Sequence, residues 1–298
     1  MSEELSLKEY IDNCCQLVDE TLDNLLPKED EEPTTIHQAM RYSMFAGGKR
    51  MRPVLTLAAA EACGGDITKA LIPACAIEMM HTYSLIHDDL PAMDNDELRR
   101  GKPTSHVKFG EGIAILAGDA LLTESFQVIS LVEPSSPYSL RNFVQELAIT
   151  GGSKFLIGGQ VRDLEGEKKQ LNEYELQAIH EGKTAALLTT ALRFGGMSAG
   201  ATEAELEALT DFGYNLGLAF QIIDDILDVT ATTEQLGKTS GKDEASEKAT
   251  YPSLIGLDNA RAAAKCRTQA ALDALLTFSE SRRQRLTEIA DYLLNRNY

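Results

Sequence analysis

The sequence predicts an all-α protein, a single large bundle of about ten helices in one domain over residues 1–298. Apolar side chains recur with the helical period along almost the whole chain, whereas the alternation typical of strands is nearly absent. Leu and Ala, which favour helices, dominate the apolar residues, and tryptophan is absent. Apolar residues make up 43% of the chain, enough for a large core, and no linker or repeat divides it.

The first half of the chain predicts helices over residues 5–25, 34–46, 53–63, 67–89 and 112–132, followed after two prolines by a helix that runs to residue 151. Glycine pairs at residues 47–48 and 64–65 follow two of these helices, as is common just past a helix end. Pro91 ends the apolar helix over residues 67–89, because proline lacks a backbone N–H and disfavours helical backbone before it.

The second half predicts a helix that begins near residue 172 and further helices over residues 202–229, 253–278 and 282–294. The first two open with capping boxes at Asn172 and Thr202, in which a glutamate three residues later bonds back to the cap. A polar stretch over residues 230–251, rich in Gly, Lys, Thr and Ser, lies between the helices over residues 202–229 and 253–278. Loops this long inside a compact domain are usually functional or disordered, so we expect a lid over the site.

The bulk properties exclude several classes of function. The net charge of −18 argues against nucleic acid as a partner, because phosphate backbones attract a surplus of Lys and Arg. The five cysteines are an odd number without a C-x-x-C pair, which favours reduced thiols over disulfides or zinc. The acidic N-terminus resembles no targeting signal, and no uncharged apolar run reaches the ~18 residues that span a bilayer. We expect a cytoplasmic protein without a membrane span.

Asp224, Asp225 and Asp228 lie inside an apolar run of a predicted helix. Asp224 and Asp228 are one turn apart on one face, and Gln221 precedes them on the same face by a further turn. Two like charges among apolar neighbours are destabilising unless a cation compensates them. Hard oxygen ligands without His or Cys favour Mg²⁺. The alternative is a solvated acidic surface.

A second acidic cluster contains Asp88, Asp89 and Asp94 at the end of the helix over residues 67–89. Asp94 follows Asp88 by six residues, which is ~240° around a straight helix, so the two side chains would not share a face. A break at Pro91 would let the chain turn and bring Asp94 back toward the same ion. Taken alone, the cluster fits an acidic surface turn equally well.

Basic residues indicate what such metal ions would bind. They occur at the junction 49–52, at 99–102 just after the first acidic cluster, at Lys183 within a helix, and at residues 238, 242 and 248 of the polar stretch. Arg binds phosphate through two parallel hydrogen bonds, Lys binds it as a point charge, and Mg²⁺ commonly bridges phosphate oxygens. No G-x-x-x-x-G-K-[ST] loop is present, which disfavours an ordinary nucleotide triphosphatase.

Four motifs in this order resemble the short-chain all-trans prenyl diphosphate synthases, most closely the bacterial farnesyl diphosphate synthases. They are Asp88-Asp89-x4-Asp94 followed by Arg99-Arg100, then Gly159-Gln160-x2-Asp163, then Lys183-Thr184, and finally Gln221-x2-Asp224-Asp225-x2-Asp228. The resemblance extends from Gly47 to the C-terminus. It implies the isoprenoid synthase fold, a helical bundle around a central cavity, and a homodimer.

The resemblance also implies the reaction. Isopentenyl diphosphate would be condensed with dimethylallyl and geranyl diphosphate by Mg²⁺-assisted ionisation, condensation and proton elimination, giving (E,E)-farnesyl diphosphate. Three Mg²⁺ ions would act in each active site, and the departing diphosphate would accept the proton. Alternatives are a geranylgeranyl diphosphate synthase, a terpene cyclase, which would need a different second metal motif, and a non-catalytic prenyl-binding or partner subunit, which would be expected to lose motif carboxylates.

The site residues follow from the resemblance by role. Metal ligands would be Asp88, Asp94 and Asp224, with Asp89, Gln160, Asp163, Asp225, Asp228 and Asp243 supporting them or acting through water. The allylic diphosphate would bind Arg99, Lys183 and Lys238, with Lys248 a weaker candidate. Isopentenyl diphosphate would bind Lys49, Arg52, His81 and Arg100, and Thr184 and Gln221 would stabilise the cation through their oxygens. His37, His106 and His180 are expected to be structural, and His87 to be a hydrogen-bonding neighbour.

Product length is the remaining question at this level. Ser84 lies one turn before Asp88, and Tyr83 lies beside it, ~7.5 Å along the helix axis from Asp88. An aromatic residue at this position could form the floor of an apolar tunnel. The resemblance supports this role, because bacterial farnesyl synthases carry an aromatic residue there and related geranylgeranyl synthases tend to carry a smaller one. The alternative is that Tyr83 is an ordinary core residue.

Overall fold

The computed structural model describes residues 5–167, 169–230 and 249–294 of the protein. The first half contains α1 (Leu7–Leu25), α2 (Thr34–Met44), α3 (Met51–Ala62), η1 (Ile67–Ala70), α4 (Leu71–Asp88), β1 (Leu98–Arg99), β2 (Lys102–Pro103), α5 (Ser105–Phe109), α6 (Glu111–Ile129) and α7 (Leu140–Gly151). The second contains α8 (Leu156–Gly166), α9 (Glu173–His180), the π-helical turn η2 (Glu181–Ala185), α10 (Ala186–Ala199), α11 (Glu203–Thr230), α14 (Tyr251–Ile255), α15 (Leu257–Ala274), η3 (Leu275–Thr277) and α16 (Glu280–Leu294). The predicted all-α class is confirmed.

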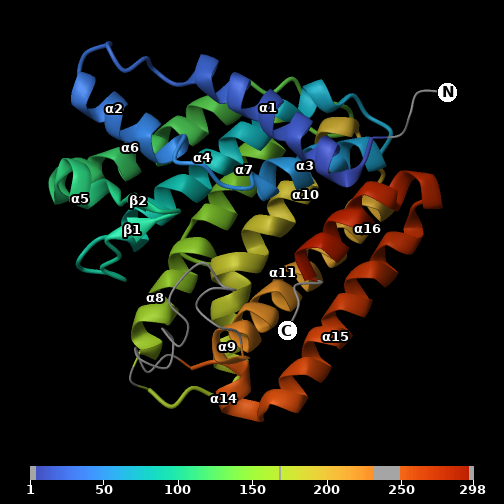
Figure 1. Ribbon diagram of the computed structural model, residues 1–298. Coiled ribbons are helices and arrows are strands. Elements are labelled where there is room, and N and C mark those ends of the chain that lie inside the picture. Colours follow the sequence, from blue (N-terminus) through green and yellow to red (C-terminus); the bar gives the residue numbers. More distant parts are fainter. Residues whose placement is uncertain (1–4, 168, 231–248, 295–298) are drawn as a thin grey trace.

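The helices pack around a centre formed by α3, α4, α10 and α11. Helix α4 packs against α3 and α6, α10 packs against α3 and α11, and α15 lies along the outer side of α11 (Figure 1). Most side chains of α3 and α4 are buried, in line with the apolar composition of both segments. One continuous hydrophobic cluster runs from Tyr10 of α1 to Leu294 of α16. The core therefore includes both the first and the last helix.

Three local features differ from the sequence-based expectation. Gly256, with φ of +82°, splits the expected helix 253–278 into α14 and α15. Helices α5 and α8 form in stretches for which the sequence predicts no helix. A short hairpin pairs Leu98 with Pro103 and Arg99 with Lys102, although almost no strand was expected. Arg100 and Gly101, both with positive φ, form its two-residue turn, as type I′ hairpins require.

Helix α6 is the one described helix that is long and apolar enough to cross a membrane by length and composition. About 39% of this apolar stretch is buried. Core helices of globular proteins meet the same criteria, and α6 packs on α2 and α4. The expected lid over residues 230–251 lies almost entirely outside the described residues, together with the candidates Lys238, Asp243 and Lys248.

Candidate active site

The first acidic cluster lies where α4 ends. The helix stops at Asp88, and the chain then turns so tightly that the backbone N–H of Asp94 donates to the carbonyl oxygen of Asp88 over 2.9 Å. The predicted break near Pro91 is confirmed. The turn brings Asp94 to the edge of a cavity that α11 borders on its other side.

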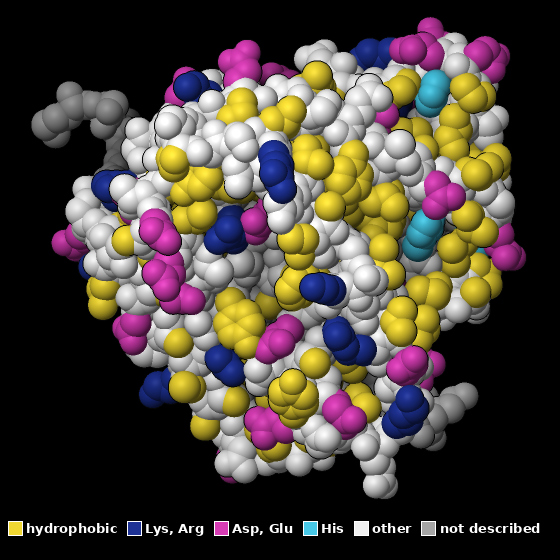
Figure 2. Space-filling view, turned by 180° about the vertical axis from the view of Figure 1, so that it is seen from behind, with side chains coloured by type: hydrophobic (Ala, Val, Ile, Leu, Met, Phe, Trp, Pro, Cys, Tyr) yellow, Lys and Arg dark blue, Asp and Glu magenta, His cyan; other side chains and the backbone are white. Residues whose placement is uncertain are grey.

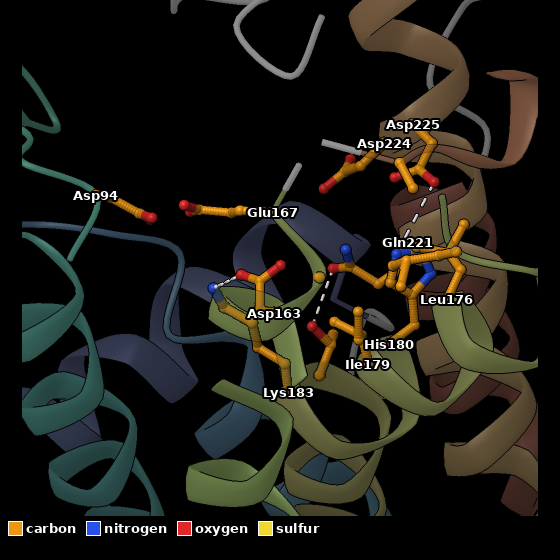
Figure 3. A pocket seen from close by; sticks show the side chains of 14 residues that line it. Asp94, Asp163, Glu167, Leu176, Ile179, His180, Lys183, Gln221, Asp224 and Asp225 are labelled. Atoms are coloured by element: carbon orange, nitrogen blue, oxygen red, sulfur yellow. Dashed lines mark hydrogen bonds and ion pairs between the residues drawn. The ribbon is translucent and has the colours of Figure 1, made fainter. Parts of the chain in front are cut away.

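The second acidic cluster lines the opposite wall of this cavity, which has a volume of about 260 Å³ and which we call the acidic cavity. In Figure 3, Asp94, Asp163 and Glu167 lie on one side, and Asp224 and Asp225 lie on the other. The two clusters, 130 residues apart in sequence, therefore meet across one space. Glu167 belongs to none of the sequence motifs, so the sequence did not predict its place here.

The helical face predicted from Gln221, Asp224 and Asp228 is only partly open to the acidic cavity. Gln221 and Asp224 line it, whereas Asp228 is 5% exposed and does not. Asp225 is also buried, and its carboxylate accepts a hydrogen bond of 2.9 Å from the backbone N–H of Tyr251 in α14. The first residue of α14 thus covers Asp225, and Asp228 is buried although it shares the helical face of Asp224.

Lys183 and Thr184 belong to the π-helical turn between α9 and α10. Such turns are rare and occur often at functional sites, because they displace side chains from the regular helical register. The Lys183 ammonium lies 2.8 Å from the carboxylate of Asp163 and 3.5 Å from that of Asp88. The Thr184 hydroxyl donates to the Gln221 side-chain oxygen over 3.0 Å. The π turn thus connects both acidic walls.

Close packing fixes the position of this turn. A Cβ atom added to Gly159 of α8 would fall against the backbone of Gly182 and Lys183, and one added to Gly182 would fall against Gly159. Because both positions lack a side chain, α8 and the π turn approach backbone to backbone. This contact explains why the Gly159-Gln160-x2-Asp163 motif accompanies Lys183-Thr184: Asp163, one turn further along α8, accepts the bond from Lys183.

The charges of Asp88, Asp163 and Lys183 influence one another beside the acidic cavity. Burial raises the pKa of the Asp88 carboxyl, an effect that nearby Lys183 opposes. Burial lowers the pKa of Lys183, but Asp88 and Asp163 outweigh it and raise the value overall. Among the described residues, no three acidic, histidine or cysteine side chains are close enough to hold one metal ion. A metal held between the two walls would therefore need further ligands, such as phosphate oxygens or water.

A separate basic cavity of about 190 Å³ contains the four predicted ligands of the second diphosphate, Lys49, Arg52, His81 and Arg100. Burial lowers the pKa of Arg52 to about 10 and lowers that of His81 well below its ordinary value, with Arg52 and Arg100 adding to the effect on His81. His81 is therefore neutral near pH 7. The Arg52 Nε atom is buried without a partner among the described residues. The cavity is suited to an anion.

A third, apolar cavity of about 300 Å³ lies between α4 and α8. Helix α4 contributes Tyr83 and Ser84, and α8 contributes the apolar residues Leu156, Ile157, Val161 and Leu164. Tyr83 is 4% exposed, and burial raises the pKa of its hydroxyl to about 12. Asp88 and Lys183 line the same cavity. Thr184 lines all three cavities, so the acidic, basic and apolar spaces meet at this residue.

Arg99 and Asp89 lie away from these three cavities. The Arg99 guanidinium donates to both carboxylate oxygens of Asp89, with distances of 2.6 to 2.9 Å. Both residues border a small space between α2, α4 and the hairpin. The predicted role of Arg99 at the allylic diphosphate therefore stays a prediction, and Asp89 lies against Arg99 at the end of α4.

Two histidines can be compared with their predicted roles. His87 lies 3.0 Å from the carbonyl oxygen of Ile115, which confirms its expected place as a hydrogen-bonding neighbour. His180, expected to be structural, lines the acidic cavity, 3.9 Å from the Asp225 carboxylate. Burial lowers the pKa of His180 to about 4, so the ring is neutral near pH 7. Its place three residues before Lys183, a predicted site residue, is a sequence signal that could have placed it there.

The chain is similar to known proteins along most of its length. Residues 33–292 match the family model described as polyprenyl synthetase. The chain is 46% identical over 293 residues to the Arabidopsis thaliana heterodimeric geranylgeranyl pyrophosphate synthase large subunit 1, covering 96% of this chain and 78% of that one. It is 45% identical over 294 residues to the geranylgeranyl diphosphate synthase of Cyanophora paradoxa, covering 98% and 97%.

Solved structures of similar fold are also found. A Zymomonas mobilis FPP/GFPP synthase superposes with a TM-score of 0.86 at 34% identity, covering 97% of this chain and 98% of that one. The bundle around Thr184 is accordingly the all-α isoprenoid synthase fold. The chain therefore belongs to the polyprenyl synthetase family and is a prenyltransferase.

Proposed function

We propose that the chain condenses isopentenyl diphosphate with dimethylallyl and then geranyl diphosphate to give (E,E)-farnesyl diphosphate. The observation that carries this proposal is the meeting of the acidic, basic and apolar cavities at Thr184. The acidic cavity suits a metal-bound allylic diphosphate, the basic cavity suits a second diphosphate, and the apolar cavity suits the hydrocarbon chain.

Magnesium fits the chemistry of the acidic cavity. Asp88, Asp94 and Asp224 would hold Mg²⁺, since carboxylate oxygens are the ligands it prefers. Asp94 and Asp224 lie on opposite walls of this cavity, and Asp88 lines the adjoining apolar cavity beside Lys183, so the three carboxylates border the space where a diphosphate would bind. When bound, Mg²⁺ supplies positive charge that stabilises the leaving diphosphate.

The protein's own residues would then act on the two substrates. Lys183, beside Asp88, would add positive charge at the allylic diphosphate. The oxygens of Thr184 and Gln221, already joined by a hydrogen bond, would face the allylic cation at the point where the cavities meet. The apolar walls from α4 and α8 would exclude water that could otherwise trap the cation. The departing diphosphate would accept the proton lost in the condensation.

Tyr83 supports the C15 product. It is buried on α4, lines the apolar cavity, and lies five residues before the diphosphate end at Asp88. We expect Tyr83→Ala to lengthen the product beyond C15, because removing the ring extends the cavity. Chromatography of the products made from isopentenyl and dimethylallyl diphosphate checks this.

Tyr83→Phe is the matched control. The Tyr83 hydroxyl has no hydrogen-bond partner among the described residues, so Phe should keep the product of the unchanged protein. A C15 product from Tyr83→Ala would rule out Tyr83 as the floor of the cavity.

Geranylgeranyl diphosphate is the second candidate product. The names of the similar Arabidopsis and Cyanophora proteins favour this C20 product. The position of Tyr83 favours C15 instead. The same chromatography decides, since the unchanged protein releases mainly C15 under the first proposal and mainly C20 under the second.

We also propose a cytoplasmic homodimer whose interface includes α6. Ile115 and Leu116 of α6 are 43% and 54% exposed, and Val107 of α5 is 51% exposed. Figure 2 shows hydrophobic side chains gathered on the right-hand side, where the turned view places α5 and α6. A second copy of the chain would cover this apolar surface. Light scattering on the purified protein tests this, and a monomer at micromolar concentration would contradict it.

A further inference from the structure

The segment that connects α2 to α3 contains Lys49 and leads into Arg52 at the start of α3, and part of its backbone is left-handed. Gly47 and Gly48 have φ of +100° and +121°, which glycine adopts without strain. Arg50 has φ of +46°, a conformation that residues with a long side chain rarely adopt. A strained residue of this kind persists only where its surroundings enforce it, and such residues concentrate at functional sites. The neighbours of Arg50 must therefore hold it in this conformation.

The Arg50 side chain, 4% exposed, fastens this segment to three other helices. Its Nε atom donates to the Asp19 carboxylate of α1 over 2.9 Å, and its Nη1 atom donates to the Glu78 carboxylate of α4 over 3.0 Å. Its Nη2 atom donates to the carbonyl oxygen of Met44 at the end of α2 over 2.6 Å. All three guanidinium nitrogens are thus bound to the protein, and these bonds offset the backbone strain.

Glu78 explains why this arrangement matters for the basic cavity. Its side chain is 2% exposed, and it lines that cavity together with Arg52, His81 and Arg100. Its charge acts on both arginines, raising the pKa of each against the larger effect of burial. A carboxylate without a partner here would pair with these arginines and compete with an anionic ligand.

We propose that Arg50 is a positioning residue for the second diphosphate. It binds the Glu78 carboxylate, which leaves Arg52 and Arg100 available to an anion, and it holds the turn that presents Lys49 and Arg52 to the basic cavity. This role rests on the proposed function, in which that cavity binds isopentenyl diphosphate. Arg50 acts through its neighbours rather than through the reacting atoms.

Arg50→Met, Arg50→Lys and the double variant Arg50→Met/Glu78→Gln test the role. We expect Arg50→Met to raise the KM and the calorimetric Kd for isopentenyl diphosphate by about tenfold or more, because a buried charged hydrogen-bond network is lost. The KM for the allylic substrate should stay within about twofold, because Arg50 lines the basic cavity only. Arg50→Lys keeps the charge, so its KM and Kd for isopentenyl diphosphate should lie between those of the unchanged protein and those of Arg50→Met.

The double variant separates competition by the Glu78 carboxylate from the effect of Arg50 on the turn. Removing the Glu78 charge from Arg50→Met should restore about threefold or more of the lost affinity, because the competing carboxylate is gone. Arg193→Met is the matched control, since Arg193 forms a partly buried ion pair with Glu146 away from all three cavities. It should lower the melting temperature without changing either KM.

The outcomes distinguish this role from the proposed function. The unchanged protein could bind isopentenyl diphosphate while both Arg50 variants bind it with a Kd within about twofold of that of the unchanged protein. This result would overturn the positioning role alone. So would a double variant that binds no better than Arg50→Met. Failure of the unchanged protein to bind isopentenyl diphosphate at all would overturn both.

Discussion

Asp224→Asn is expected to lower kcat by about 10³-fold, because it removes the metal-binding charge from the α11 wall of the acidic cavity. Asparagine has nearly the same shape, so the packing of α11 should not change. Asp224 faces further carboxylates across the cavity, and removing one of several like charges relieves repulsion in the protein without bound metal. The free energy of unfolding should therefore stay the same or rise while activity falls.

Steady-state kinetics with saturating Mg²⁺ and urea unfolding measure the two effects of this substitution. Asp211→Asn is the matched control, because Asp211 is exposed on the same helix and lines none of the three cavities. It should leave both quantities unchanged. If Asp224→Asn keeps more than about a tenth of the original kcat, the assignment of Asp224 as a metal ligand is wrong.

Lys183→Met is expected to lower kcat/KM for the allylic substrate by about 10²- to 10³-fold. Lys183 is the cation that the π turn places between Asp88 and Asp163, where we propose that the allylic diphosphate binds. Methionine keeps the length of the side chain but removes the charge, which leaves two partly buried carboxylates without this partner. The KM for isopentenyl diphosphate should change little, because Lys183 does not line the basic cavity.

Two further variants control for this substitution. Lys183→Arg keeps the charge in a different shape and should recover part of the activity. Lys265→Met removes an exposed charge from α15 and should have no effect. A Lys183→Met protein that loses affinity for isopentenyl diphosphate, but not for the allylic substrate, would show that the two cavities have been assigned in the wrong order.

Much of the acidic cavity could be predicted from the sequence, because its signals are local. Pro91 predicts the end of α4, and that break is what brings Asp94 toward Asp88. The one-turn spacing of Gln221 and Asp224 predicts that both face the same way, as they do. Helical geometry alone is enough for these statements.

The remainder depends on tertiary packing. Asp225 is buried beneath the start of α14, where the Tyr251 N–H binds its carboxylate. Asp228 is buried one turn beyond Asp224, which their shared helical face does not predict. The π turn at Lys183 depends on the backbone contact between Gly159 and Gly182, which no periodicity reveals. Arg50 reads in the sequence as one more phosphate ligand, yet its partners Asp19 and Glu78 are 31 and 28 residues away. Pairing over such distances is set by the fold.

The most direct test of the central claim is turnover of isopentenyl and dimethylallyl diphosphate by the purified protein with and without Mg²⁺. The claim is that two carboxylate walls bind a metal–diphosphate group beside an apolar cavity. We expect prenyl diphosphate products in the presence of Mg²⁺ and a loss of activity when a chelator removes it, with recovery when Mg²⁺ is returned. Absence of Mg²⁺-dependent turnover would contradict the claim and would favour a non-catalytic prenyl-binding or partner subunit.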